Sequence, residues 1–471
     1  MKRQSLSLKT RQTGTPFVAL LLLIALGLPI TQVAAQIAGT PAPRREQLLN
    51  GLRLLLLHRP NDPQVMLKMR INSGAAFDLA GKEGLMTLLS DALFSDPATR
   101  QYVTEELNGQ LEINTSYDHI EILLRGKTSD FERLAELLRN ALLQMRLAPE
   151  DVKRLRDERL KAARDTSETP ALAADRAIAA RLYGSYPYGR TLAGTPESLT
   201  RIERTDLMLA RDRFLNPNNS TLVLIGGVEG PRAMRVFRQF LGSWRKSDSI
   251  PPATFRQPDA PDARTLIVNL PGTNEVEVRL AVRGLSRTDR DRAAASVIAA
   301  LVRERWTTAL KKLQPKSTFA RHDAHNLSGE ILLGATVAAT AAAQTLEAAR
   351  ALLRDLAASL VSALEFDNAR RAAFAALNER KQQPTALADE WLDATTYNTT
   401  LADEERALDA LTPADVQRVA ARIFGEGKLA SVVAGDATLL RNELARLSGG
   451  IEVLKVNSSA PATAPEPSKR P

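Results

Sequence analysis

The chain of 471 residues contains no cysteine, and this absence excludes several kinds of chemistry. Disulfide bonds, zinc ribbons, iron–sulfur clusters, thiol nucleophiles and a lipid anchor on an N-terminal cysteine all require that residue. Histidine is almost as rare. A histidine-built metal or catalytic site would have to draw on four residues: His58, His119, His322 and His325.

Aromatic residues and unbalanced charge are also scarce. The chain has 12 Phe, 6 Tyr and 3 Trp, and no dense basic tract is interleaved with them. The formal net charge is +9, and residues 1–35 contribute four basic side chains and no acid to it. A mild excess spread over helices rich in both signs predicts a solvated surface, so we expect no nucleic-acid partner.

What is present begins with an export signal at residues 1–35. A basic start is followed by a run of 12 apolar residues at 17–28, then by Pro29 and by Val33-Ala-Ala35 before Gln36. This order is typical of a cleaved secretory signal peptide. The alternative is an uncleaved membrane anchor, but the run is shorter than the roughly 20 residues needed to cross a bilayer. We therefore expect a soluble, periplasmic mature protein without a membrane partner.

The remaining chain mixes strand and helix patterns, which predicts an α+β fold. Residues 65–71 alternate apolar and basic side chains as a half-buried strand does, and residues 81–94 place apolar side chains at helical spacing. Further elements follow in order: a strand at 112–125, helices at 130–145 and 149–165, a strand at 220–226 and a helix ending at Trp244. Residues 246–262, rich in Pro and Asp, predict a linker, and residues 457–471 predict a disordered tail.

The part of the chain after the linker repeats the part before it. The strand pattern at 275–282 follows that at 65–71 by about 211 residues, and Asp415 follows the matching Asp206 by 209. Order and spacing persist, which favours two copies of one α+β unit over two unrelated lobes. We expect two homologous lobes, at 46–245 and 263–447, each an antiparallel or mixed sheet packed against helices.

Several segments resemble the insulinase/pitrilysin family of zinc peptidases, the inverzincins, and its mitochondrial-processing-peptidase-like members in particular. They occur in the family's order between about residues 46 and 447, and the duplication agrees with the family's two-lobed halves. The segments are Leu49-Asn-Gly-Leu-Arg53, Asn72-Ser-Gly-Ala-Ala-Phe-Asp78, Gly81-Lys-Glu-Gly-Leu85, Tyr186-Pro-Tyr-Gly-Arg190, Gly194-Thr-Pro-Glu-Ser198 and Arg213-Phe-Leu-Asn-Pro-Asn-Asn-Ser-Thr-Leu-Val223.

The resemblance places the family's H-x-x-E-H motif on the helix at 81–94, where this chain lacks it. In the family, two histidines bind zinc and the glutamate activates the zinc-bound water. The matching positions here are Thr87, Ser90 and Asp91, and the third ligand is matched by Glu158. A hydroxyl and two carboxylates suit zinc poorly, and serine is no general base near neutral pH without a base of its own. We expect no metal, no cofactor and no catalytic residue in this chain, whereas Mg²⁺ or Ca²⁺ bound weakly at Asp91 and Glu158 is the alternative.

The histidines that remain do not form an obvious replacement site. His322 and His325 are three residues apart, which on a strand points their rings to opposite faces, whereas on a helix they could form a metal pair. The resemblance places them on a strand. We expect all four histidines to be surface or structural residues.

The resemblance also implies residues that would hold a peptide. An arginine and a tyrosine that bind peptide backbone in the family match Arg305 and Phe319, so the arginine is kept and the tyrosine hydroxyl is lost. Arg305 could equally be one more charged helix residue. The family's peptide-binding edge strand matches residues 110–115, where Glu112 replaces a common asparagine. Such an edge accepts an extended peptide through backbone hydrogen bonds.

Three functions are compatible with these sequence features. The first is a non-catalytic subunit of a heterodimeric, peptide-degrading zinc protease whose partner carries H-x-x-E-H and the zinc, with unfolded or short peptides as ligands. The second is a peptide-binding or structural assembly protein with no proteolytic partner. The third, an active metallopeptidase using Asp91 and Glu158, must replace both the metal ligands and the base.

Overall fold

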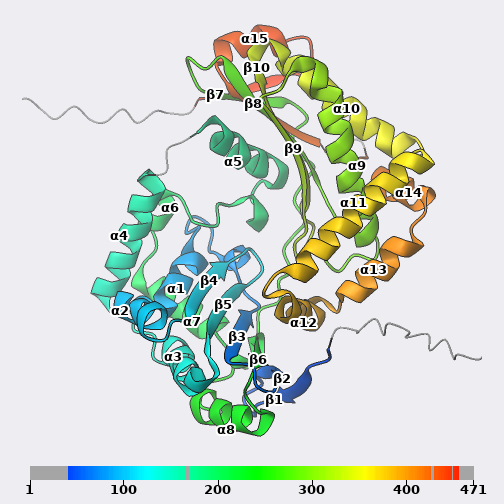
Figure 1. Cartoon of the computed structure of the whole chain (residues 1–471). Coiled ribbons are helices and arrows are strands. Elements are labelled where there is room, and N and C mark those ends of the chain that lie inside the picture. The colour runs from blue at the N-terminus through cyan, green and yellow to red at the C-terminus, as the bar shows by residue number, and fades with distance from the viewer. Residues whose placement is uncertain (1–40, 166–168, 426–428, 448, 456–471) are drawn as a thin grey trace, which may run out of the picture. The chain divides into compact units, whose positions relative to one another are not determined.

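The computed structural model describes residues 41–165, 169–425, 429–447 and 449–455. The signal peptide predicted at 1–35 and the tail predicted at 457–471 lie outside the described residues. Two six-stranded mixed sheets are each packed against helices (Figure 1). The expected α+β fold with two helix-packed lobes is therefore confirmed. No helix in the described ranges is both long and apolar enough to cross a membrane.

The first half of the chain builds a sheet of order β1-β2-β6-β3-β5-β4. Its strands are β1 (Arg44–Gln47), β2 (Arg53–His58), β3 (Gln64–Ile71), β4 (Gln110–Thr115), β5 (Ile120–Lys127) and β6 (Ser220–Gly226). Its helices are α1 (Leu85–Leu93), α2 (Pro97–Gln101), α3 (Phe131–Leu143), α4 (Pro149–Asp165), α5 (Pro170–Tyr183), α6 (Pro196–Thr200), α7 (Arg204–Phe214) and α8 (Gly230–Leu241).

The second half builds a sheet of order β12-β7-β11-β8-β10-β9. Its strands are β7 (Thr265–Asn269), β8 (Glu275–Arg283), β9 (Ser317–Asp323), β10 (Glu330–Ala338), β11 (Leu429–Gly435) and β12 (Ile451–Lys455). Its helices are α9 (Arg292–Leu310), α10 (Ala342–Ala358), α11 (Ala363–Gln382), α12 (Ala386–Tyr397), α13 (Leu401–Ala410), α14 (Pro413–Ile423) and α15 (Ala437–Leu444). Residues 246–262, between the halves, contain neither helix nor strand.

Five strands of each sheet follow the same plan. β2 runs parallel to β6 as β7 does to β11, and the remaining neighbours are antiparallel in both sheets. The repeated aspartates have the same local role: Asp206 and Asp415 each accept the backbone N–H of the residue before the helix, Glu203 and Thr412 respectively. The sheets differ at one edge, where β1 is antiparallel to β2 but β12 is parallel to β7.

Two expected elements differ from the structure. The strand predicted at 112–125 is a hairpin, β4 and β5, because the Ser116 hydroxyl accepts the N–H groups of Asp118 and His119 and closes a turn. The helix predicted at 81–94 begins at Leu85, since Gly84 has a φ of 92° and cannot continue a right-handed helix backwards.

Each half lends a helix to the other half's sheet. One face of each sheet packs on that half's own helices in a large apolar core. On the opposite face of the first sheet, Trp391 and Leu392 of α12 pack against Leu55 and Val223. On the corresponding face of the second sheet, Ile178 of α5 packs in a cluster with the second sheet's strands. The two halves therefore bury apolar surface reciprocally.

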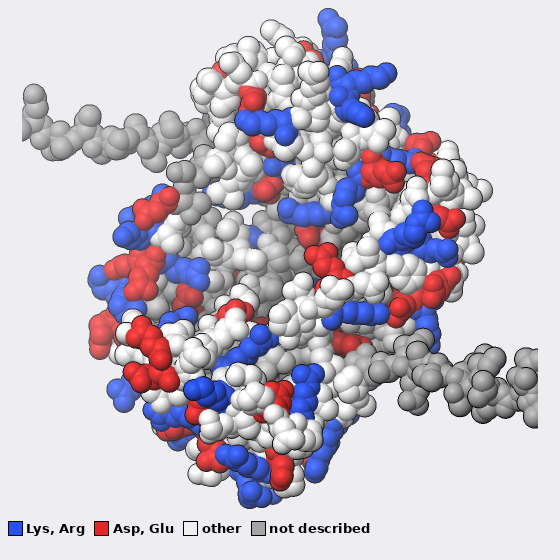
Figure 2. Space-filling model, in the orientation of Figure 1, with Lys and Arg blue, Asp and Glu red and all other residues white. Residues whose placement is uncertain are grey.

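Charge is well mixed on the surface. On the face shown in Figure 2, Lys and Arg side chains are interspersed with Asp and Glu and do not gather into one basic patch. Some surface charges pair locally, as in the i,i+4 pair of Lys153 and Asp157 on α4. This is the arrangement of a solvated helical surface.

Candidate functional site: the degenerate motif on helix α1

Helix α1 positions the residues that match the zinc-peptidase motif. Its leucine stripe, including Leu88 and Leu89, is buried in the first core. Thr87 and Ser90 are also buried, and the side chain of Asp91 is 25% exposed. The helix thus presents its polar positions toward β4, toward the loop that contains Leu192 and toward α4.

The two hydroxyl groups are already engaged in hydrogen bonds. Thr87 Oγ1 donates to the carbonyl oxygen of Leu192 at 2.6 Å. Ser90 Oγ donates to the carbonyl oxygen of Thr87 at 2.7 Å and accepts from Thr115 Oγ1 at 2.7 Å. A hydroxyl whose proton is donated to a carbonyl has no neighbouring base to activate it, so Ser90 replaces the general base in position but not in chemistry.

Asp91 faces an arginine. Arg159 of α4 donates to both carboxylate oxygens of Asp91, with Nε to Oδ2 at 2.6 Å and Nη2 to Oδ1 at 2.7 Å. The hydrogen bond to Asp91 raises the pKa of the Arg159 guanidinium despite its burial. A bidentate guanidinium satisfies the carboxylate in charge and in geometry. Arg159 therefore supplies the positive charge that neutralises the Asp91 carboxylate.

The predicted grouping of Glu158 with Asp91 is wrong. The Glu158 side chain is 59% exposed and pairs with Arg154 one turn earlier on α4, at 2.9 Å. The side chains of adjacent residues on an α-helix point about 100° apart. Because Arg159 faces α1, Glu158 cannot face α1 as well. The inward face of α4 carries Val152, Leu155 and then Arg159, and Glu158 lies outside it.

The donor set at this place does not fit a catalytic zinc ion. Catalytic zinc takes three protein ligands, most of them nitrogen or charged oxygen. Here both hydroxyl protons and both oxygens of Asp91 are committed to protein partners, and the nearest further charge is the cation Arg159. Within the described ranges, no three or more His, Asp or Glu side chains are arranged to hold a metal ion.

The pairing of Asp91 with Arg159 predicts a measurable coupling energy. In a double-mutant cycle with Asp91→Ala and Arg159→Ala, urea unfolding should give a coupling of about 1–2 kcal/mol, because the pair is bidentate and two-thirds buried or more. The matched cycle on the same helix, Arg154→Ala with Glu158→Ala, should give less than about 0.5 kcal/mol because that pair is exposed. Equal coupling in both cycles would contradict the assignment of Arg159 to the inward face.

The predicted peptide edge is open in the structure. β4 is the last strand of the first sheet and pairs only with β5 among the described strands. Glu112 and Asn114 are exposed, while Leu111 and Ile113 pack on the first core. The strand can therefore accept an extended chain along its free side through backbone groups.

The predicted peptide ligands from the second half lie apart from each other. Arg305 sits in the helical layer, where it pairs with Asp355 of α10 at 2.5 Å and with Glu365 of α11 at 3.2 Å. Its expected role at a bound peptide is not supported by this position, because both acids already occupy the guanidinium. Phe319 lies on edge strand β9 beneath Arg279, whose guanidinium carbon is 5.0 Å from the ring centroid.

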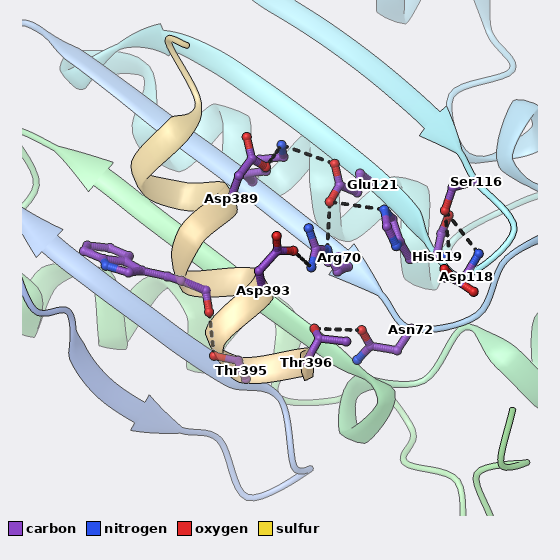
Figure 3. A network of polar contacts seen from close by, with 12 residues as sticks. Arg70, Asn72, Ser116, Asp118, His119, Glu121, Asp389, Asp393, Thr395 and Thr396 are labelled. Carbon is purple, nitrogen blue, oxygen red and sulfur yellow. Dashed lines mark hydrogen bonds and ion pairs between the residues drawn. The ribbon is translucent and has the colours of Figure 1, made fainter. Parts of the chain in front are cut away.

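The halves meet at a buried charge network that the sequence pattern does not reveal (Figure 3). Arg70 of β3 pairs with Glu121 of β5 and with Asp393 of α12, both at 2.7 Å. Lys68, two residues earlier, pairs with Glu121 at 3.2 Å and with Asp389 of α12. The alternation of basic and apolar residues in β3 indicated side chains facing solvent, whereas they face the helix lent by the other half.

Three histidines lie at or near this junction. His119 Nε2 is 3.5 Å from Glu121, and His325 Nδ1 is 4.0 Å from Asp118. Asp118 also accepts the Tyr188 hydroxyl and the Asn326 N–H, so it joins the β4–β5 turn to the loop after β9. Burial lowers the pKa of His119, His322 and His325, as expected of neutral structural imidazoles.

Comparisons with family models agree with this fold. Residues 53–196 match the family model described as insulinase (peptidase family M16), and residues 201–373 match that of the peptidase M16 inactive domain. The chain belongs to the insulinase family, peptidase family M16. The half that contains α1 is the one that matches the family's peptidase model.

Curated relatives are identical to the chain at about a quarter of the aligned residues. An uncharacterized zinc protease of Mycobacterium leprae is 27% identical over 263 residues, 54% of this chain and 58% of that protein. The mitochondrial-processing peptidase subunit beta of Neurospora crassa is 22% identical over 265 residues, 54% of this chain and 55% of that protein. The chain thus spans about half the length of the curated relatives it matches.

Solved structures share the fold. A protease from Helicobacter pylori has a TM-score of 0.75 at 18% identity, covering 83% of this chain and 99% of that one. A peptidase M16 inactive domain from Pseudomonas fluorescens has a TM-score of 0.74 at 18% identity, covering 84% and 98%. The periplasmic protease PqqL from Escherichia coli has a TM-score of 0.70 at 14% identity, covering 86% and 49%.

Proposed function

We propose that this chain is the exported, non-catalytic subunit of a heterodimeric, peptide-degrading zinc protease whose partner carries the H-x-x-E-H motif and the zinc. The observation that carries the proposal is the Asp91–Arg159 pair, which puts a guanidinium against the one carboxylate that stands at a metal-ligand position of α1. The Arg159 guanidinium already neutralises this carboxylate, and its positive charge would repel a metal cation.

Peptide hydrolysis by such a site needs an activated water and a group to take its proton. Ser90 stands where the family has its base and donates its proton to a carbonyl oxygen. The chain can still contribute to a peptide chamber, because the free edge of β4 offers backbone hydrogen bonds that do not depend on side-chain identity. The likeness to a relative named as a subunit of a processing peptidase supports a subunit role.

A second function is favoured by the other half. Arg305 is enclosed by Asp355 and Glu365, and Phe319 lacks a hydroxyl, so two side chains that would hold peptide backbone are lost. A peptide-binding or assembly protein without a proteolytic partner would tolerate both losses.

The deciding experiment is purification of the tagged mature chain from the periplasm of its native cell, with mass spectrometry of bound proteins and zinc analysis. We expect a stoichiometric partner that bears H-x-x-E-H, and zinc and peptidase activity in the complex but not in the isolated chain. Recovery of the chain without such a partner would favour the assembly function. One zinc per isolated chain, with peptidase activity lost in Asp91→Ala, would establish a metallopeptidase with unconventional ligands instead.

A further inference from the structure

A cavity of about 800 Å³ lies away from the motif positions, in the first half and under the linker. Its walls are the residues 76–79 before α1 and Leu85 at the start of α1, the end of α5 with the residues that follow, the outer side of α7 and the linker residues 255–262. Thr87, Ser90 and Asp91 do not line it. Its volume is within the range of sites that bind small molecules.

One wall is a row of aromatic rings. Phe77 lies between Phe214, at 4.9 Å between centroids, and Phe255 of the linker, at 5.8 Å. Phe255 in turn contacts Tyr186, at 6.1 Å. In a chain with few aromatic residues, this row is a concentration of apolar surface. Leu209 of α7, which is 70% exposed, extends that surface.

The acids of the cavity are mostly engaged elsewhere. Asp78 accepts the N–H groups of Gly84 and Met86 at the start of α1, both at 2.7 Å. Asp206 pairs with Lys82 at 2.6 Å, and Asp262 pairs with Arg264 at 2.6 Å. The carboxylate of Asp259, on the linker, stays exposed.

Two arginines of the cavity are in the opposite situation. Arg213 of α7 and Arg256 of the linker have exposed side chains, and neither forms an ion pair with any described residue. The guanidinium of Arg213 lies over the ring of Phe214, at 5.5 Å, so it is positioned beside the aromatic row. An apolar wall with uncommitted cations beside it is complementary to a ligand with an apolar body and a negative head.

We propose that this cavity binds a small amphipathic carboxylate, with its apolar tail along Phe77, Phe255 and Leu209 and its carboxylate near Arg213 and Arg256. Because the linker forms one wall, and Arg283 of β8 holds the linker through the carbonyl oxygens of Pro258 and Asp259, the ligand would contact the segment that joins the two halves. Neither the family models nor the curated relatives assign a ligand to this place.

The test uses the full mature chain and 11-(dansylamino)undecanoate, whose fluorescence rises on entering an apolar site. We expect saturable binding at one site per chain, displaced by dodecanoate but not by dodecyltrimethylammonium, which has the same tail and the opposite charge. Displacement by both compounds alike would overturn the role of the arginines.

Matched variants locate the site. Leu209→Asp should weaken binding by about tenfold or more, since it removes apolar contact and adds a repelling charge, whereas Leu364→Asp, at a leucine 71% exposed on α11, should not. Arg213→Gln and Arg256→Gln should each weaken binding about two- to fivefold, whereas Arg235→Gln on α8 should leave it unchanged. Exposed substitutions of this kind should leave the fold intact.

Two results would overturn the proposal: no saturable binding of the probe, or binding that Leu209→Asp and the double variant of Arg213 and Arg256 leave unchanged. Displacement of the probe by a peptide or an uncharged lipid would be a third result against the proposal. These outcomes are distinguishable from the proposed subunit role, because the varied side chains belong to neither α1 nor β4 and because Thr87, Ser90 and Asp91 do not line the cavity.

Discussion

Replacing Arg70 with methionine is expected to lower the free energy of unfolding by about 3 kcal/mol, measured by urea denaturation. The Arg70 side chain is 4% exposed and its guanidinium joins Glu121 of β5 to Asp393 of α12. Burial alone would lower the pKa of Arg70, but these two carboxylates raise it above its usual value. Removing the cation takes the closest partner from both carboxylates and leaves Glu121 with Lys68 at 3.2 Å and Asp393 with Arg287 at 3.5 Å. Loss of one partner is the costly case for a buried ion pair.

The matched control is Arg133→Met on α3. That arginine pairs with Glu136 at a similar distance, 2.6 Å, but the two side chains are 47% and 38% exposed. Its loss should cost less than about 1 kcal/mol, since exposed pairs contribute little. A loss for Arg70→Met as small as that for Arg133→Met would show that the junction does not depend on the network.

The same pairing of a buried base on a strand with an aspartate on a helix recurs in the second half. Arg279 of β8, which occupies the place of Lys68 in the repeat, pairs with Asp175 of α5 at 2.6 Å. Each sheet therefore has a buried base on its central strand that binds an aspartate on the helix lent by the other half. The duplication extends from the strand order to the ionic contacts that join the copies, which explains why basic residues persist in otherwise apolar strands.

Much of this fold is readable from the sequence because its signals are local. The strand at β6 coincides with the predicted bounds. The spacing of Asp206 and Asp415, which indicated the duplication, corresponds to a shared local structure because each carboxylate caps its own helix. The hairpin of β4 and β5 was missed because its turn contains neither glycine nor proline and relies on the Ser116 hydroxyl.

The site and the junction were harder to predict because they depend on contacts between distant segments. The choice between Glu158 and Arg159 is a matter of one helix position, and the sequence of α4 carries both residues on a strongly charged surface. Arg70 and Asp393 are more than 300 positions apart, so no local pattern links them. Asp389 and Asp393, one turn apart on α12, were the available signal, since they form an acidic stripe that matches Lys68 and Arg70.

Acidification is expected to destabilise the fold through His119, the second large effect at this junction. Burial lowers the pKa of His119 to about 4, with the charge of Arg70 adding to the decrease and Glu121 opposing it. The unfolded chain takes up a proton on this imidazole near its ordinary pKa of about 6.5, whereas the folded chain does so only near 4. Stability is therefore lost as the pH falls through this window, by on the order of 3 kcal/mol.

The comparison of wild type with His119→Gln isolates this contribution. The variant cannot titrate at this position, so its stability should fall less between pH 7 and pH 4 than that of the wild type, and His58→Gln, at the exposed end of β2, is the matched control. Burial raises the pKa of Asp78 and Glu330 to about 7. Their contribution to the stability of the fold therefore decreases as the pH rises, in wild type and variant alike. Burial would raise the pKa of Glu121, but Arg70, His119 and Lys68 outweigh it and lower this pKa to about 2, so the stability that Glu121 contributes is lost mainly below the window. Parallel pH profiles of wild type and His119→Gln would mean that the imidazole is accessible to protons in the folded chain, and the junction would then have to be open at that edge.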